Sequence, residues 1–208
     1  MTRAKICGIT CLEDALWAEG LGAWAVGFVL VPSSRRYLSP EAVRPIAQGL
    51  GPLVVRVGVF ADTPPEVVLR QMEVAGLQVV QLHGDEPPEW AEQVRRFFPV
   101  IKAIRLFGPA SPDWLSYPAE ALLVDGASPG SGQAYPLGWL EPLRAHPRLI
   151  IAGGLTPENL PSALALKPYG VDVSSGVEAA PGRKDPDKLR AFLAQVARFN
   201  GTGSPSEP

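Results

Sequence analysis

Short apolar runs recur along the chain and alternate with segments that have the character of helices. Apolar residues stand at consecutive positions within each run, which is typical of strands in a sheet that helices cover on both faces. We predict eight such strands, at Ala4–Ile9, Ala23–Leu30, Val54–Phe60, Val79–Gly84, Val100–Leu106, Ala121–Gly126, Leu149–Gly154 and Val171–Gly176.

Helix start signals stand between these strands. Thr10 precedes the first predicted helix, and Ser-Pro or Thr-Pro pairs at 39–40, 63–64 and 156–157 precede three others. A hydroxyl side chain caps a helix, and proline is favoured in its first turn. The segment 108–118 is short and interrupted by proline, so it predicts the weakest helix. Strand–helix units of roughly 20 to 30 residues, repeated eight times, predict a single-domain (β/α)8 TIM barrel of the α/β class. A doubly wound open sheet is the alternative.

Composition sets limits on this picture. A chain of 208 residues with 46% hydrophobic and 19% charged content is sufficient for one buried core, which we place at residues 1–199. A formal net charge of −2 without a Lys/Arg run argues against nucleic acid and membrane surfaces as partners. The first residues lack the apolar segment of a signal peptide, and two cysteines are too few for a disulfide framework, so we expect a cytoplasmic protein. Residues 200–208 lack apolar side chains and are expected to form a disordered tail.

The last two predicted strands, LIIAGG at 149–154 and VDVSSG at 171–176, both end in small residues. Glycine lets backbone amides approach an anion closely, and a helix start adds unpaired N–H groups. In a parallel barrel, the loops after strands 7 and 8 are the usual phosphate site. The pair therefore predicts a phosphate site, with two ordinary strand-to-helix turns as the alternative.

Polar residues gather at the predicted C-terminal ends of strands, where barrel enzymes carry their chemistry. They are Cys7, Gln81, His83, Arg105, Asp125, Asp172 and Ser174. Strand alternation puts Lys5 and Cys7 on one face, so a buried ammonium below the thiol would favour the thiolate. Cys7 as a small buried hydrophobe is the alternative.

Asp125 follows three apolar residues and precedes a glycine-rich loop. A partly desolvated carboxyl group at this position suits a proton donor, whereas a turn cap is the alternative. His83 is either a base or a hydrogen-bonded wall residue. Arg35 and Arg36 belong either to a solvated turn or to a fork that holds a carboxylate. Cys7, Cys11 and His83 lack a fourth ligand, so we predict no metal site.

Six segments together resemble a known family. They are KICGIT (5–10), VPSSRRYLSP (31–40), VQLHGDE (80–86), LLVDG (122–126), IIAGGLTPENL (150–160) and VDVSSGVEAAPGRKD (171–185). In this order, they are similar to the phosphoribosylanthranilate isomerases of tryptophan biosynthesis, and the resemblance runs from Lys5 to about Phe199. It implies an Amadori rearrangement of N-(5-phosphoribosyl)anthranilate that uses no cofactor.

The resemblance also implies roles for individual residues. Cys7 matches the general base and Asp125 the general acid. Arg36 matches the arginine that faces the anthranilate moiety, Asp172 lies near the ribose, and His83 lines the mouth of the site. The phosphate cup corresponds to Gly153, Gly154, Ser174, Ser175 and Gly176.

The chain departs from the family pattern in two places. Ser34-Arg35-Arg36 replaces the usual Ser-Pro-Arg, which leaves open which arginine reaches the substrate. The segment 130–135 reads GSGQAY where the family has GGTGK, and Gln133 supplies no charge there. Another phosphosugar barrel, such as an epimerase or a thiamine-phosphate-type synthase, and a barrel that only binds a phosphorylated metabolite are the competing hypotheses. We expect a monomer or a homodimer and favour the homodimer.

Overall fold

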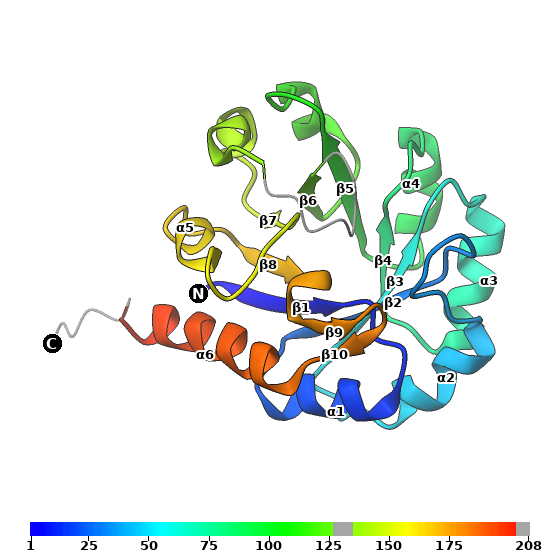
Figure 1. The fold of residues 1–208 in the computed structure, drawn as a ribbon. Helices are drawn as coiled ribbons and strands as arrows, with labels where there is room; N and C mark the ends of the chain where they lie inside the picture. Colours follow the sequence, from blue (N-terminus) through cyan, green and yellow to red (C-terminus); the bar gives the residue numbers. More distant parts are fainter. Residues whose placement is uncertain (127–134, 203–208) are drawn as a thin grey trace, which may run out of the picture.

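Eight parallel strands close into a barrel in chain order, from β1 to β8 (Figure 1). The structure is a computed structural model that describes residues 1–126 and 135–202. This closed barrel confirms the predicted (β/α)8 fold and excludes the open sheet. The strands are β1 Arg3–Cys7, β2 Ala25–Val29, β3 Val55–Phe60, β4 Val79–Leu82, β5 Val100–Leu106, β6 Ala121–Gly126, β7 Leu149–Ile151 and β8 Gly170–Val173.

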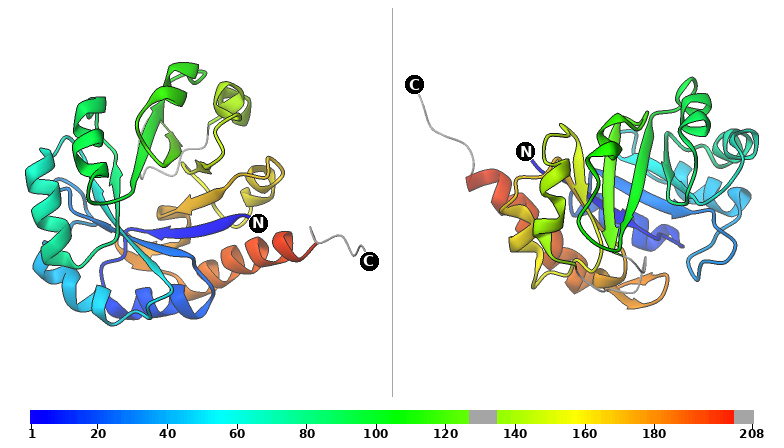
Figure 2. Two further views of the ribbon diagram at one scale, coloured as in Figure 1. Left: turned by 180° about the vertical axis from the view of Figure 1, so that it is seen from behind. Right: turned by 90° about the horizontal axis from the view of Figure 1, so that it is seen from above.

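Helices surround the barrel, as the two further views show (Figure 2). The side chain of Ser39 caps the second helix as predicted, because its Oγ accepts a hydrogen bond from the backbone N–H of Ala42. The α-helices are α1 Leu12–Gly20, α2 Pro40–Gln48, α3 Pro65–Ala75, α4 Pro88–Arg95, α5 Leu160–Leu164 and α6 Pro186–Thr202.

Three connections are 3-10 turns, η1 Pro112–Ser116, η2 Leu137–Leu143 and η3 Ser175–Val177. The weak helix predicted after the fifth strand is η1, whose prolines and short length prevent a longer helix. The two candidate phosphate segments also differ from expectation. β7 and β8 end at Ile151 and Val173, and the residues that follow form turns rather than starting an α-helix directly. α5 begins only at Leu160, and η3 follows β8.

A small antiparallel hairpin between η3 and α6 is absent from the sequence prediction. Its strands are β9 Glu178–Ala180 and β10 Arg183–Lys184. Gly182 joins them with a φ of +81°, in the region that glycine adopts readily. In Figure 1 the hairpin lies beside the end of β1.

The core has two parts, one on each face of the barrel wall. Outward-facing residues such as Ala4 and Ile6 pack with the helices in the larger cluster. A smaller cluster fills part of the barrel interior, with Ala103, Leu123 and Ile150 at its centre. Because strand residues alternate between the two faces, the polar residues at the interior positions are directed into the lumen.

The start of the tail predicted at residue 200 is wrong, because residues 200–202 belong to α6. α6 includes residues 200–202, since Asn200 is tied to the N-terminus by two hydrogen bonds. The N–H of Thr2 donates to Asn200 Oδ1 at 2.8 Å, and Asn200 Nδ2 donates to the Thr2 carbonyl at 2.9 Å. Residues 203–208 lie outside the described residues. In the part of the chain that the structure describes, no helix is long and apolar enough to cross a membrane.

Candidate functional site at the C-terminal mouth of the barrel

Cys7 ends β1 and is directed into the barrel together with Lys5, as the alternation predicted. A Cβ atom placed on Gly27 of β2 would lie 2.9 Å from the Cys7 sulfur and 3.1 Å from Lys5 Nζ. Gly27 therefore makes room for both groups on its side of the lumen. Both side chains are buried, with 8% of Cys7 and 5% of Lys5 exposed.

The predicted effect of Lys5 on Cys7 is present, because its ammonium lowers the pKa of the thiol, but burial acts more strongly. Burial raises the pKa of the Cys7 thiol, and Asp172 adds to this effect. The ammonium groups of Lys5 and Lys184 act in the opposite direction but do not outweigh burial. The thiol form therefore dominates at neutral pH, and the nearby cations limit the free-energy cost of ionising it.

Asp172 lies one layer below Cys7 and pairs with Lys5. Its Oδ1 is 2.9 Å from Lys5 Nζ, and the two residues are register partners in β8 and β1. Burial alone would lower the pKa of Lys5, but the charges and hydrogen bonds of Asp172 and Cys7 together outweigh burial and raise it. The pair thus holds a fixed ammonium in the lumen under the thiol.

Asp125 lies on β6 and faces His83, which follows β4. Asp125 Oδ1 accepts a hydrogen bond of 2.7 Å from the Gly126 N–H, and Oδ2 lies 3.3 Å from His83 Nε2. On its other side, His83 Nδ1 is 3.1 Å from Gln81 Nε2. Tyr135 approaches from the next segment and donates its hydroxyl proton to the Val124 carbonyl. Burial and the Asp125 charge raise the pKa of Tyr135.

The two predicted phosphate turns lie against each other. Gly153 and Gly154 have φ values of +81° and +66°, which a residue with a side chain rarely adopts. A Cβ on Gly176 would lie 1.8 Å from the Leu155 carbonyl oxygen, so the turn after β8 contacts the turn after β7 through a bare backbone. Among the described residues, Ser174 Oγ is buried and has no hydrogen-bond partner. Ser175 is half-buried beside it.

Arg36 turns toward Cys7, whereas Arg35 is exposed. A Cβ on Gly8 would lie 2.4 Å from Arg36 Cδ, so this glycine lets the arginine lie against the end of β1. The Nε and Nη2 groups of Arg36 donate to the two carboxylate oxygens of Glu178 at 2.7 and 2.6 Å. Glu178 therefore binds the Nε and Nη2 edge of the Arg36 guanidinium, the group expected to face a substrate carboxylate. A ligand would meet the Nη1 edge instead.

Lys184 connects this ion pair to Cys7. Its Nζ donates to the Cys7 carbonyl at 2.6 Å, to the Ser174 carbonyl at 3.2 Å and to Glu178 Oε1 at 3.0 Å. Burial lowers the pKa of Lys184, and Glu178 opposes that shift. Burial would raise the pKa of Glu178, but Arg36 and Lys184 outweigh it and lower that pKa.

Sequence reasoning missed Glu178 and Lys184 as parts of the site. Both belong to the β9–β10 hairpin, whose polar residues carry no strand or helix periodicity. One sequence signal could have identified them. Both residues lie in VDVSSGVEAAPGRKD (171–185), one of the segments on which the family resemblance rests. Residues 127–134, which include Gln133, lie outside the described residues. In the described ranges 1–126 and 135–202, no group of three His, Cys, Asp or Glu side chains could hold a metal ion.

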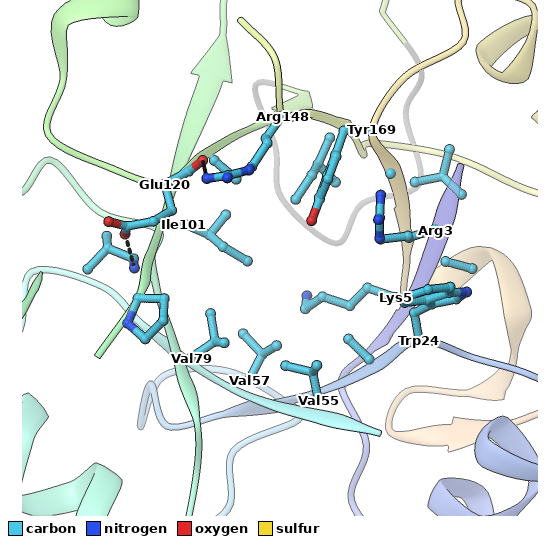
Figure 3. A pocket seen from close by; sticks show the side chains of 18 residues that line it. Arg3, Lys5, Trp24, Val55, Val57, Val79, Ile101, Glu120, Arg148 and Tyr169 are labelled. Atoms are coloured by element: carbon cyan, nitrogen blue, oxygen red, sulfur yellow. Dashed lines mark hydrogen bonds between the residues drawn. The ribbon is translucent and has the colours of Figure 1, made fainter. Parts of the chain in front are cut away.

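A cavity of about 510 Å³ occupies the opposite end of the barrel (Figure 3). Residues that start strands line it, including Val55 and Val79. Small residues at interior positions, Ala25, Ala121 and Gly170, leave this space unfilled. Arg3 lies at its edge between two aromatic rings, 4.9 Å from the Trp24 centroid and 4.3 Å from the Tyr169 centroid.

Comparisons with known proteins agree on one family. Residues 4–195 match the family model described as N-(5'phosphoribosyl)anthranilate (PRA) isomerase. A curated N-(5'-phosphoribosyl)anthranilate isomerase of Geobacter sp. (strain M21) is 44% identical over 209 residues, covering 96% of this chain and 100% of that protein. The crystal structure of the Thermus thermophilus phosphoribosyl anthranilate isomerase superimposes with a TM-score of 0.93 and is 64% identical, covering 95% of this chain and 100% of that chain.

A third similar protein is described by its oligomeric state. It is the structure of monomers generated from the dimeric phosphoribosylanthranilate isomerase of Thermotoga maritima, with a TM-score of 0.84 and 40% identity. The match covers 95% of this chain and 100% of that chain. These matches set aside the competing hypotheses of a different phosphosugar barrel and of a barrel without catalytic activity.

Proposed function

Because the chain belongs to the N-(5'-phosphoribosyl)anthranilate isomerase family, we propose that Cys7 is the general base and Asp125 the general acid of its reaction. The protein is an isomerase of tryptophan biosynthesis. It converts N-(5-phosphoribosyl)anthranilate to 1-(2-carboxyphenylamino)-1-deoxyribulose 5-phosphate by an Amadori rearrangement. This chemistry needs one group that gives a proton to the furanose oxygen and another that removes the proton from C2′.

The observation that carries the assignment is the placement of the two residues. Cys7 and Asp125 are buried residues at the C-terminal ends of β1 and β6, with β7 and β8 between them around the barrel. Both face the lumen, so a sugar bound between them would meet a different group on each side. The turns after β7 and β8 lie between these two positions and so flank the same space.

Asp125 acts first, when the ring opens. Its carboxyl proton moves to the furanose oxygen as the bond between C1′ and that oxygen breaks, which leaves a Schiff base between the aniline nitrogen and C1′. The Gly126 N–H donates to Oδ1 at 2.7 Å, so the proton is exchanged at Oδ2, which lies 3.3 Å from His83 Nε2. The carboxyl group is only 7% exposed, which keeps bulk water from competing for that proton.

Cys7 acts second, on the Schiff base. Its thiolate removes the proton from C2′, the electron pair of that bond forms the enolamine, and tautomerisation gives the ketone. Because burial raises the pKa of the Cys7 thiol, only a minor fraction of the protein carries the thiolate that acts as the base. Lys5 and Lys184 favour that fraction, and Arg36 interacts with the same charge. Activity should therefore rise with pH on its acidic limb.

The phosphate group binds at the paired turns after β7 and β8. Ser174 Oγ is buried and has no hydrogen-bond partner in residues 1–126 and 135–202, and the bare backbone at Gly153, Gly154 and Gly176 lets N–H groups approach an anion. Ser175 completes the cup. Because this end of the substrate is remote from C1′ and C2′, its binding energy serves to position the reacting carbons.

Arg36 binds the anthranilate carboxylate through its Nη1 edge. Glu178 holds the opposite edge, which fixes the direction of the guanidinium and raises the pKa of Arg36. Asp172 supports the site from below through its ion pair with Lys5, and its position near the ribose stays a prediction. His83 lines the mouth beside Asp125.

The partners we propose are the phosphosugar substrate and a second copy of the chain. At the N-terminal end of the barrel, Leu53 is 92% exposed, two residues before Val55, which starts β3 and lines the cavity of about 510 Å³. An exposed leucine beside an apolar opening matches the self-complementary surface of a two-fold dimer. The Thermotoga maritima relative is described as dimeric. We also place the protein in the cytoplasm, where its two free cysteines would stay reduced.

The test of the base is turnover by Cys7→Ser, with Cys11→Ser as the matched control. Cys11 lies at the start of α1, away from the lumen. Loss of a positioned base lowers the rate by about 10² to 10⁴, so Cys7→Ser should lose activity on this scale, whereas Cys11→Ser should stay close to the parent. The assay follows loss of anthranilate-type fluorescence from freshly generated substrate. Full activity in Cys7→Ser would exclude the thiolate as the base.

A further inference from the structure

The polar side chain of Gln81 is fully buried in the barrel interior. Burying an amide costs free energy unless it is hydrogen-bonded. Its Nε2 meets His83 Nδ1 at 3.1 Å, whereas Oε1 has no hydrogen-bond partner among the described residues. An aliphatic residue would fill this strand position without that cost, so the amide indicates a specific role toward His83.

The other ring nitrogen of His83 points at Asp125. Nε2 is buried and forms no hydrogen bond within standard limits to any described residue, and Asp125 Oδ2 lies 3.3 Å away. This is slightly longer than an ordinary N–H···O hydrogen bond. Catalytic hydrogen bonds are often long before the substrate binds and shorten in the reacting complex.

The segment that carries His83 is fixed by its own contacts. The His83 N–H donates to the Phe60 carbonyl at 2.7 Å. The next residue, Gly84, donates its N–H to Glu86 at 2.9 Å and accepts from Lys102 Nζ at 2.6 Å. Lys102 and Glu86 are a buried ion pair at 2.6 Å. The imidazole therefore has a defined place relative to β6.

We propose that His83 is a positioning residue that donates from Nε2 to Asp125, and that Gln81 fixes the histidine tautomer which makes this possible. If Gln81 donates to Nδ1, that nitrogen is an acceptor and the ring proton is on Nε2. The Nε2–H then meets Oδ2, while the Gly126 N–H meets Oδ1. Both oxygens of Asp125 have a donor.

The consequence concerns the moment when Asp125 gives up its proton. Negative charge develops on the carboxylate as the ring oxygen is protonated, and the two N–H donors face that charge. The hydrogen bond from His83 should strengthen as the proton leaves, because a carboxylate is a better acceptor than a carboxylic acid. This inference rests on the proposed acid role of Asp125. It adds the row of side-chain contacts from Gln81 through His83 to Asp125 as the arrangement that supports Asp125 as the acid.

The tautomer is measured directly by nitrogen NMR. The chain has two histidines, His83 and His146, so a His146→Gln protein labelled with ¹⁵N-histidine reports His83 alone. We expect the neutral ring with its proton on Nε2. In Gln81→Glu, the new carboxylate should draw the ring proton to Nδ1 or make the ring an imidazolium. A parent ring with its proton on Nδ1 would overturn the proposal.

Kinetics test whether His83 acts through Asp125. A hydrogen bond to a charged group accounts for about 10- to 100-fold in rate, so His83→Asn should lower kcat by this factor with little change in KM. His83→Gln should recover part of the loss, since its longer amide places an N–H near the Nε2 position. Gln81→Met should lower kcat in the same direction. Circular dichroism of each variant checks that it is folded.

A double-mutant cycle separates this inference from the proposed function. In the Asp125→Asn background, His83→Asn should cost no further activity, because its target is already removed. Additive losses would overturn the positioning role of His83 while leaving Asp125 as the acid. Near-normal turnover of Asp125→Asn alone would instead refute the proposed acid, and the inference with it.

Discussion

The two ends of this barrel are formed by the same eight strands, yet they carry different chemistry. At the C-terminal ends, the lumen holds the thiol of Cys7, the carboxyl group of Asp125 and the imidazole of His83. At the N-terminal ends, valine, alanine and isoleucine line a cavity together with Arg3, Glu120 and Arg148 (Figure 3). Lys5 borders both regions, since it lines the cavity and pairs with Asp172 below Cys7.

Small residues have opposite effects in these two regions. Ala25, Ala121 and Gly170 leave an unfilled volume at the N-terminal end, which valine and isoleucine side chains line together with a few charged ones. At the C-terminal end, Gly153 and Gly176 lie in turns, where the absence of a side chain exposes backbone to an anion. We infer that one end supports chemistry and the other supports assembly. The predictions below test that division.

The largest effect is expected for Asp125→Asn. The amide keeps the shape of the side chain but has no acid proton, so kcat should fall by about 10² to 10⁴. The matched change at the other end is Glu120→Gln. Glu120 accepts a hydrogen bond from Val100 N–H at the start of β5, a role that an amide can retain. Steady-state turnover of the two variants gives the comparison, and similar losses in both would contradict a chemical division between the ends.

The placement of Asp125 was predictable because it depends on local sequence. β5 and β6 have the bounds predicted from their apolar runs, and Ser39 caps α2 as its Ser-Pro pair indicated. The strand ends therefore identified the face of the barrel on which polar residues meet. By contrast, β9 and β10 have only three and two residues and no apolar run, so no periodicity indicated them.

Other features of the site depend on contacts between distant parts of the chain. Lys184 reaches the Cys7 carbonyl across 177 residues of sequence, and Glu178 reaches Arg36 across 142 residues. The net direction of the Cys7 pKa shift was not predictable for the same reason. Alternation revealed the neighbouring Lys5, but the burial that outweighs it exists only in the folded barrel.

A smaller effect, on binding rather than on turnover, is expected for Arg36→Met. Loss of a charge-assisted contact to the anthranilate carboxylate should raise KM by about 10- to 100-fold and change kcat less. Glu178 keeps its partner Lys184 at 3.0 Å, so the variant does not leave this carboxylate unpaired. Arg35→Met is the control, because Arg35 is exposed. Equal KM values in the two variants would remove the assigned contact.

The pH dependence of Cys7 alkylation tests the electrostatics of the same end. Burial raises the pKa of the thiol, and only the thiolate reacts. In Cys11→Ser protein, alkylation by iodoacetamide should therefore be slow at neutral pH and continue to accelerate above the pH at which an ordinary thiol levels off. The unfolded protein supplies that ordinary thiol. A folded-state midpoint below the unfolded one would mean that Lys5 and Lys184 outweigh burial.

The smallest effect on turnover, and the clearest effect on assembly, is expected for Leu53→Asp. Leu53 is 92% exposed at the N-terminal end of the barrel, two residues before β3, and burying a leucine contributes about 1.5–3 kcal/mol, twice in a symmetric dimer. An aspartate there would place a charge in the proposed interface, so sedimentation should show a monomer, whereas we expect a dimer for the parent. Phe107→Asp is the control, since Phe107 is 78% exposed just after β5, at the opposite end. It should leave the dimer intact.

We expect kcat of Leu53→Asp within about twofold of the parent, because its change lies at the end of the strands away from Cys7 and Asp125. A dimer that persists in Leu53→Asp would place the interface elsewhere, and a large loss of kcat in a folded monomer would show that the two ends of the barrel are coupled.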